Sequence, residues 1–259
     1  MDDLRALAER LATSAGALQL DRLAGPRTVE SKSTPTDVVS EVDRACERLI
    51  VDTLRSERPD DGIVGEEGTC DPGTSGLRWV VDPLDGTVNY LYRAASFGVS
   101  VGVEDGDGPL AGAVYDPQRD ELYSAARGAG ATLNGAPLRA NAVTGLPQAL
   151  VATGFSYDAG ERAWQAGVLT TVLPRVRDIR RSGSAALDMC AVAAGRVDAY
   201  FELGPAPWDR SAALVICAEA GAVGSVRPAA LPGRELTVVA AAGVFDPLVA
   251  LLTEAGALG

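Results

Sequence analysis

A series of short strand patterns between residues 97 and 138 constrains the fold of this chain more than any other feature. Short apolar segments bounded by Gly, Asp, Asn and Pro are typical of β-strands joined by tight turns, so this region predicts an antiparallel meander. The segments are Val99 to Val103, Leu110 to Tyr115 and Glu121 to Ala126, and the turns hold Gly106-Asp107-Gly108, Pro117-Gln118 and Asn134-Gly135.

Helical and strand patterns flank this meander. An amphipathic helix with a plausible Asp2 cap opens the chain, and a second helix starts near Ser40; short strands at Ile63-Val64 and Trp79 to Val81 follow. Beyond Gly145, strand patterns precede helices near 162–173, 184–194, 208–220 and 245–252. We therefore predict an α+β protein with helices layered on its sheets, an antiparallel half over residues 1–140 and an α/β half over 141–259.

The chain contains no histidine among its 259 residues. This absence excludes Ser-His-Asp and Cys-His nucleophilic sites and most catalytic zinc sites. Catalysis must then rest on carboxylates, hydroxyls, backbone dipoles and hard metal ions. With 47% hydrophobic and 22% charged residues, the chain can bury a sizeable core.

Charge and hydropathy narrow the expected partners. The net charge is −12, from 35 acidic against 23 basic residues, so we expect no basic face for nucleic acid. No apolar segment approaches the roughly 18 residues of a membrane span, and no signal peptide is evident, so we expect a cytoplasmic protein without a membrane partner. The four cysteines form no CxxC pair, and three lie in apolar helical patterns that predict buried free thiols.

The densest chemical signal is the segment Trp79-Val80-Val81-Asp82-Pro83-Leu84-Asp85-Gly86-Thr87. An apolar strand ends there in two carboxylates three positions apart, followed by a Gly-Thr turn. This geometry can aim Asp82 and Asp85 at one point while the amides of Gly86 and Thr87 face an anion. A solvated polar turn is the alternative reading of the same residues.

Two further acidic positions follow strand or helix boundaries, Glu66 in Gly65-Glu66-Glu67 and Asp209 in Trp208-Asp209. Taken alone, two adjacent glutamates in an exposed loop usually carry no function, and Asp209 is equally consistent with a helix N-cap. If these carboxylates converge with Asp82 and Asp85, they repel one another, and hard divalent cations offset that repulsion. Magnesium fits such a site because it favours carboxylates together with water and phosphate.

The three acidic motifs occur in the same order along the chain as the signatures of the inositol monophosphatase family, which they resemble. The resemblance covers nearly the whole chain, from about Leu4 to Leu252. The first signature is matched by Trp79 to Tyr90, the others by Gly65-Glu66-Glu67 and Trp208-Asp209. The resemblance implies the layered αβαβα sandwich of sugar phosphatases. It also implies hydrolysis of a small phosphate monoester, above all myo-inositol monophosphate, by water that bound magnesium activates.

The resemblance assigns the metal ligands residue by residue. Glu66, Asp82 and the backbone carbonyl of Leu84 match the ligands of a first ion. Asp82, Asp85 and Asp209 match those of a second, and Glu66 also faces a third. The family pattern thus implies about two to three Mg²⁺ ions in each active site.

The resemblance also assigns the groups around the reacting phosphate. Thr87, with Asp43 and Glu66, matches the residues that orient and activate the attacking water, and the amides of Gly86 and Thr87 match the phosphate cradle. The positions that match substrate-binding residues are Asp85, Gly183, Ser184, Ala185, Glu202 and Asp209. Ser40-Glu41-Val42-Asp43 is also a capping-box pattern, so a purely structural Asp43 is an open alternative, as is a solvated, strand-end Glu202.

Departures from the family pattern concern the substrate. Tyr92 and Ala95 stand where many members have histidine and proline, and Ala206-Pro207 replaces a segment that often carries histidine. Fructose 1,6-bisphosphate, a nucleotide 3′-phosphate and histidinol phosphate are alternative substrates, and Arg180-Arg181 could serve a bisphosphate. A catalytically silent, protein-binding member of the fold is the alternative from another class.

A haloacid-dehalogenase-type phosphatase is rejected, because its D-x-D motif has one residue between the aspartates where this chain has two. That family also needs a downstream lysine, and the single lysine, Lys32, lies upstream. The resemblance to inositol monophosphatases further implies a homodimer and inhibition by lithium.

Overall fold

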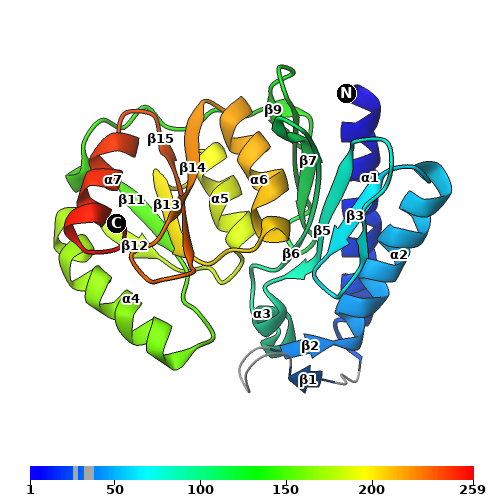
Figure 1. Cartoon of the computed structure of the whole chain (residues 1–259), viewed down its shortest axis with the longest axis horizontal. Helices are drawn as coiled ribbons and strands as arrows, with labels where there is room; N and C mark the ends of the chain where they lie inside the picture. The colour runs from blue at the N-terminus through cyan, green and yellow to red at the C-terminus, as the bar shows by residue number, and fades with distance from the viewer. Residues whose placement is uncertain (26–28, 32–37) are drawn as a thin grey trace.

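The computed structural model describes residues 1–25, 29–31 and 38–259, and Lys32 lies outside them. Two sheets and their helices stack as alternating layers (Figure 1). The larger sheet has the strand order β10-β9-β8-β7-β6-β5-β3-β4, and the smaller has the order β12-β11-β13-β15-β14. A separate two-stranded sheet pairs β1 (Val29–Ser31) with β2 (Val38–Ser40).

The larger sheet contains the predicted meander. Its strands β6, β7 and β8 are antiparallel neighbours in chain order, which confirms the prediction from the turn residues. Asn134 and Gly135 both have positive φ at the tight turn between β9 and β10. One pair, β3 with β5, is parallel. The strands are β3 (Gly62–Gly65), β4 (Cys70–Asp71), β5 (Arg78–Asp85), β6 (Gly98–Asp105), β7 (Gly108–Asp116), β8 (Glu121–Ala126), β9 (Ala131–Leu133) and β10 (Ala136–Pro137).

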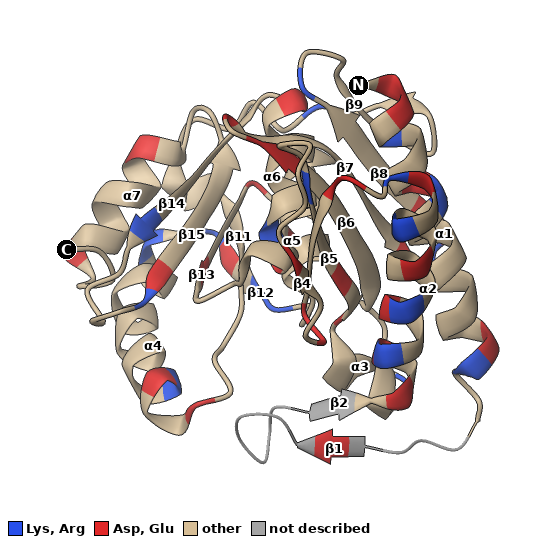
Figure 2. Cartoon of the chain, turned by 45° about the vertical axis from the view of Figure 1, so that its right-hand side comes forward, with Lys and Arg blue, Asp and Glu red and all other residues tan. Residues whose placement is uncertain are grey.

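Helices α1 (Asp2–Arg22) and α2 (Glu41–Glu57) pack on the outer face of this sheet, against β5 to β8. Acidic and basic residues alternate along the solvent side of α2 (Figure 2), while the apolar sides of both helices join the core. The predicted Asp2 cap is wrong, because Met1 is the N-cap and no side chain caps the first turn. Ser40 does cap α2, with the reciprocal bond from its amide to Asp43 that its sequence pattern predicts.

The smaller sheet is mixed. Strand β11 pairs in parallel with β12 and β13, whereas β15 pairs antiparallel with β13 and β14. β14 has no predicted counterpart, since it is an edge strand with much of its length exposed. The strands are β11 (Leu150–Thr153), β12 (Asp178–Arg180), β13 (Ala199–Leu203), β14 (Ala222–Pro228) and β15 (Glu235–Ala241).

Helices α5 (Ala185–Ala193) and α6 (Pro207–Glu219) fill the layer between the two sheets, and α4 (Ala159–Val172) and α7 (Phe245–Glu254) cover the outer face of the smaller sheet (Figure 1). The predicted αβαβα sandwich is thereby confirmed. Close contact in the middle layer requires glycine: a Cβ on Gly112 in β7 would come within 2.7 Å of the Cα of Ala212 in α6. The division of the chain at residue 140 stays a prediction.

The remaining short elements are α3 (Thr87–Tyr92) and two 3₁₀ turns, Leu146–Gln148 and Leu173–Arg175. Cys46, Cys190 and Cys217 are buried in helices as expected, and Cys70 is exposed. Within the described ranges, no helix is both long and apolar enough to span a membrane.

The contacts of Asp61 predict how its substitution changes the stability of the fold. Its buried carboxylate accepts bonds from the Trp79 indole (2.9 Å), Ser75 (2.6 Å) and Arg58 (2.7 Å). Burial raises the pKa of Asp61, but these bonds outweigh it, so the pKa lies below its ordinary value. Asp61→Asn should therefore lower the free energy of unfolding by about 2 kcal/mol at pH 7, as measured by urea unfolding.

The stabilisation from a lowered carboxylate pKa is present above the pKa of the unfolded chain and is lost as pH falls through the folded value. The difference between wild type and Asp61→Asn should accordingly stay constant from pH 7 to about pH 4 and shrink between about pH 4 and pH 2. An equal difference across the lower range contradicts the charged role of Asp61.

Candidate active site

Strand β5 and the turn after it carry the centre of the site. β5 continues to Asp85 and does not stop at Asp82 as predicted, because Asp85 still pairs with Gly98 of β6 across a register shift. Gly86 follows with φ of 90°, where a Cβ would lie 2.8 Å from the carbonyl oxygen of Ser96. Glycine is therefore required for the chain to turn from β5 into α3.

A cavity of about 290 Å³ opens at this turn, between the two sheets. Every residue that the sequence singled out for the site lines it, except Asp43. These lining residues are Glu66, Asp82, Leu84, Asp85, Gly86, Thr87, Gly183, Ser184, Ala185, Glu202 and Asp209. Their roles are not decided by this placement, but segments far apart in the chain do meet at one cavity.

Asp82 and Asp209 are brought together through β6. Ser100 lies opposite Asp82 in the β5–β6 register, and its hydroxyl donates to the Trp208 carbonyl at 2.9 Å. This bond ties the start of α6 to the larger sheet beside Asp82. Asp209 is the third residue of α6 and not its N-cap, which is Ala206; its carboxylate accepts from the Ala206 amide at 2.6 Å.

The carboxylates around the cavity repel one another. Burial raises the pKa of Asp82, and the charges of Glu66, Asp85 and Asp209 raise it further. Burial likewise raises the pKa of Asp209, with Asp85 and Glu66 adding to the effect. Among the described residues that line the cavity, Arg181 is the single cation. Among the described residues that line the cavity, acidic side chains therefore outnumber basic ones, and the crowded carboxylates disfavour one another's charged form.

Asp85 is held by the start of α5. Its Oδ2 accepts from the Ser184 hydroxyl at 2.5 Å and from the Ala186 amide at 2.7 Å. Burial raises the pKa of Asp85 to about 6, although these bonds oppose the shift. Ser184 is also the N-cap of α5, so the residue that starts the helix also orients the carboxylate.

Asp43 lies behind Thr87 and does not line the cavity. The Thr87 hydroxyl is 2.9 Å from Oδ1 of Asp43 and 3.0 Å from the carbonyl oxygen of Leu84. Ser40 donates to the other Asp43 oxygen through its hydroxyl and amide. Burial raises the pKa of Asp43 against these bonds. Asp43 therefore closes the capping box and also contacts Thr87, while its part in activating water stays a prediction.

Glu202 borders the cavity from β13. Tyr200 donates to its carboxylate at 2.8 Å, and burial raises the pKa of Glu202 to about 7. A Cβ on Gly154 would overlap this carboxylate, so glycine there leaves room for Glu202. Glu202 is not a solvated strand end, which was the alternative reading.

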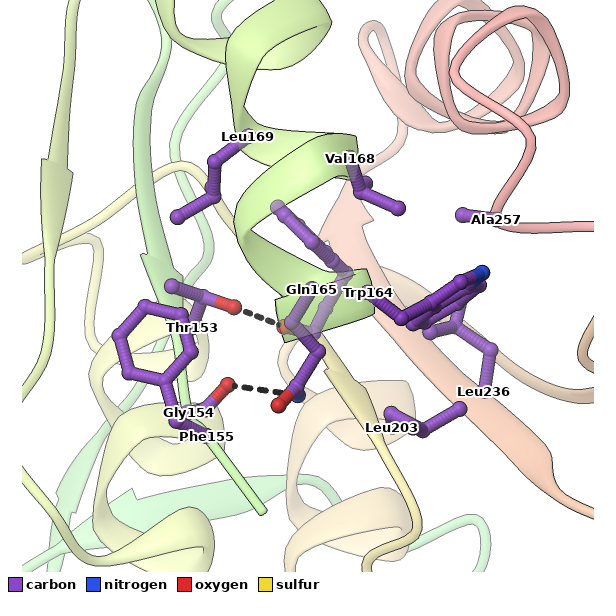
Figure 3. Close-up of a pocket in the computed structure, with 11 residues that line it drawn as sticks. Thr153, Gly154, Phe155, Trp164, Gln165, Val168, Leu169, Leu203, Leu236 and Ala257 are labelled. Atoms are coloured by element: carbon purple, nitrogen blue, oxygen red, sulfur yellow. Dashed lines mark hydrogen bonds between the residues drawn. The ribbon is translucent and has the colours of Figure 1, made fainter. Parts of the chain in front are cut away.

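The structure adds lining residues that sequence reasoning missed, namely Gly154, Phe155, Tyr157, Asp188, Gly204 and Ala206. The loop after β11 supplies three of them. Gln165 of α4 holds this loop, accepting from the Ser156 amide at 2.9 Å and donating to the Gly154 carbonyl at 3.2 Å. Figure 3 shows Gln165 beside Gly154 in a small apolar pocket behind the loop. No local pattern marks these residues, because their contacts are long-range.

The chemical types of the candidate ligand atoms suit magnesium. They are oxygens of carboxylates and of a backbone carbonyl, without nitrogen or sulfur ligands, and hard cations prefer oxygen. In the described part of the chain, no three acidic, histidine or cysteine side chains are placed to hold an ion by themselves. The carboxylates of Asp82, Asp85 and Asp209, which are expected to bind a second ion, therefore do not converge on one point in this structure. Magnesium fits this open arrangement, since it keeps several water or phosphate ligands.

A family model agrees with the geometry. The model described as "Inositol monophosphatase family" matches residues 1–255. The chain belongs to the inositol monophosphatase family. Inositol-1-monophosphatase SuhB of Mycobacterium tuberculosis is 45% identical to this family member over 270 residues, covering 96% of this chain and 93% of that protein.

Other comparisons agree on the fold. The solved structure of Mycobacterium tuberculosis SuhB has a TM-score of 0.85 at 40% identity, covering 100% of this chain and 98% of that one. Nus factor SuhB of Escherichia coli is 40% identical over 220 residues, covering 84% of this chain and 82% of that protein. Because one relative is named a Nus factor, the site itself must carry the argument about activity.

Proposed function

We propose that this family member is a magnesium-dependent phosphatase that hydrolyses a small phosphate monoester, with myo-inositol monophosphate as the preferred substrate. The observation that carries the proposal is the cavity that Asp82, Asp85 and Asp209 line together. The charges of Asp85 and Asp209 raise the pKa of Asp82 there, and one arginine is the single cation among the described lining residues. A protein-binding surface has no need for such a charge excess inside a cavity. Bound Mg²⁺ offsets it and, in such sites, activates water and stabilises the leaving alkoxide.

The ion ligands in this proposal are Glu66, Asp82, Asp85, Asp209 and the Leu84 carbonyl. Thr87 orients the attacking water, because its hydroxyl lies in the cavity wall with Asp43 directly behind it. Asp43 accepts a hydrogen bond from the Thr87 hydroxyl, which leaves the lone pairs of the hydroxyl oxygen free to accept a hydrogen bond from water. The amides of Gly86 and Thr87, at the start of α3, hold the phosphate oxygens.

The far side of the cavity favours a neutral polyol as the alcohol. Glu202 and Asp188 are acceptors for hydroxyl groups, and Ser184 and Ala185 border the same space. A second phosphate would meet these acids and a single guanidinium, that of Arg181. Arg180 is not available to bind a second phosphate, since it forms an ion pair with Asp178 and does not line the cavity. This balance favours inositol monophosphate over fructose 1,6-bisphosphate.

The test is phosphate release from inositol 1-phosphate, fructose 1,6-bisphosphate, adenosine 3′,5′-bisphosphate and histidinol phosphate at fixed Mg²⁺, with and without lithium. We expect lithium-sensitive turnover that is fastest with inositol 1-phosphate. Faster turnover of another ester moves the substrate while keeping the chemistry, and no turnover of any ester supports the silent, protein-binding alternative. The expected homodimer and the cytoplasmic location stay predictions.

A further inference from the structure

Glu47 is a buried carboxylate that the proposed chemistry does not use. It lies on α2 one turn beyond Asp43 and is 5% exposed. An acidic side chain is rarely buried without partners that compensate its charge. Among the described residues, the hydrogen-bond partners of Glu47 belong to the turn between β3 and β4, which carries Glu66.

Three donors of this turn converge on Glu47. The Glu67 amide donates to Oε2 at 2.8 Å, and the Thr69 amide and hydroxyl donate to Oε1 at 3.2 and 2.7 Å. Both carboxylate oxygens of Glu47 therefore accept hydrogen bonds from residues that follow Glu66 in the turn. The contact spans 20 to 22 positions in sequence, so it fixes the turn relative to α2.

Glu66 lies between the points at which the turn is held. Its own amide donates to the Val81 carbonyl of β5 at 3.1 Å, and the next amide is the one bound by Glu47. The Gly65 amide closes the turn by donating to the Thr69 carbonyl at 2.9 Å. A Cβ on Gly65 would overlap the Glu47 carboxylate, so this close approach depends on glycine.

We propose that Glu47 is a positioning residue that holds the turn of residues 65–69 so that Glu66 faces the magnesium site. The inference rests on the proposed function, because it takes Glu66 as a metal ligand. Through α2, one helix then places both Asp43 behind Thr87 and Glu66 at the metal site. Groups that orient a ligand without touching the metal typically change metal affinity by about 10- to 100-fold when they are removed.

The experiment measures Mg²⁺ binding by calorimetry on metal-free protein without substrate, followed by kcat against Mg²⁺ concentration. In Glu47→Gln an amide NH₂ replaces one oxygen and meets N–H or O–H donors, so the turn loosens. We expect the Mg²⁺ dissociation constant to rise about tenfold, and kcat at saturating Mg²⁺ to stay within about threefold. Glu41→Gln, an exposed change on the same helix, should leave both values unchanged.

Thr69→Val is the milder variant and decides the matter if Glu47→Gln does not fold. It removes one bond to Glu47, and we expect about threefold weaker Mg²⁺ binding. Its matched control is Thr53→Val, whose hydroxyl bonds the Leu49 carbonyl within α2. Unchanged Mg²⁺ affinity in a folded Glu47→Gln or in Thr69→Val overturns the positioning role, as does lower kcat that saturating Mg²⁺ does not restore.

The wild-type protein separates this inference from the proposed function. Wild type that binds Mg²⁺ but hydrolyses none of the esters overturns the phosphatase, and the affinities of the variants still decide on Glu47. Wild type that binds no Mg²⁺ overturns both.

Discussion

Asp82→Asn is expected to lower kcat by about 10³-fold or more with saturating Mg²⁺, and at the same time to stabilise the metal-free protein. The value of kcat should fall because Asp82 is the one carboxylate assigned to both the first and the second ion. The metal-free protein should become more stable because Asp82 is buried among the charges of Glu66, Asp85 and Asp209. Asparagine can keep the bond that Oδ1 accepts from the Leu84 amide at 2.9 Å, so the turn should survive.

The expected gain in unfolding free energy is about 1 kcal/mol, a typical value for relieving a strained functional site. Thermal unfolding in excess chelator measures it, and phosphate release measures kcat. Asp61→Asn is the matched control, since the same substitution there removes a satisfied charge and should reduce stability while leaving kcat unchanged. A destabilised Asp82→Asn, or one with more than a tenth of wild-type kcat, contradicts the site as described.

Thr87→Val is expected to lower kcat by about 10²- to 10³-fold, within the range typical of a positioned proton-transfer group. Valine has nearly the shape of threonine but can neither bond Asp43 nor orient water. Thr87→Ser keeps the hydroxyl and should retain most of the activity. The Mg²⁺ affinity of both variants should stay close to that of wild type, because the Thr87 hydroxyl is not among the assigned ligands.

The comparison of valine with serine separates chemistry from packing. Equal loss of kcat in both variants indicates that Thr87 acts through its methyl group or through α3, and contradicts a role in positioning water. A large rise in the Mg²⁺ dissociation constant of Thr87→Val contradicts the division of roles between Thr87 and the carboxylates.

Local chemistry made much of the fold predictable. The meander follows from Gly, Asp and Asn turns whose geometry depends on a few neighbouring residues, and Ser40 starts α2 because its capping partners lie within three positions. The acidic ends of strands and helices likewise marked Glu66, Asp82, Asp85 and Asp209, which the structure places around one cavity.

Long-range pairing explains what could not be predicted. β5 runs on to Asp85 because Gly98 of a later strand pairs with it. Gly154 enters the site because Glu202, on β13, lies against it. Asp188 occupies a helical position that has no local mark of function, and only the packing of α5 between the sheets brings it to the cavity.

Hydrolysis of inositol 1-phosphate in ¹⁸O-labelled water, with and without Mg²⁺, tests whether water attacks the phosphorus atom and whether this attack depends on Mg²⁺. We expect release that requires Mg²⁺, with one ¹⁸O in each phosphate and none in inositol, because water attacks phosphorus. Release that is independent of Mg²⁺, label in inositol, or no release at any Mg²⁺ concentration would contradict this mechanism.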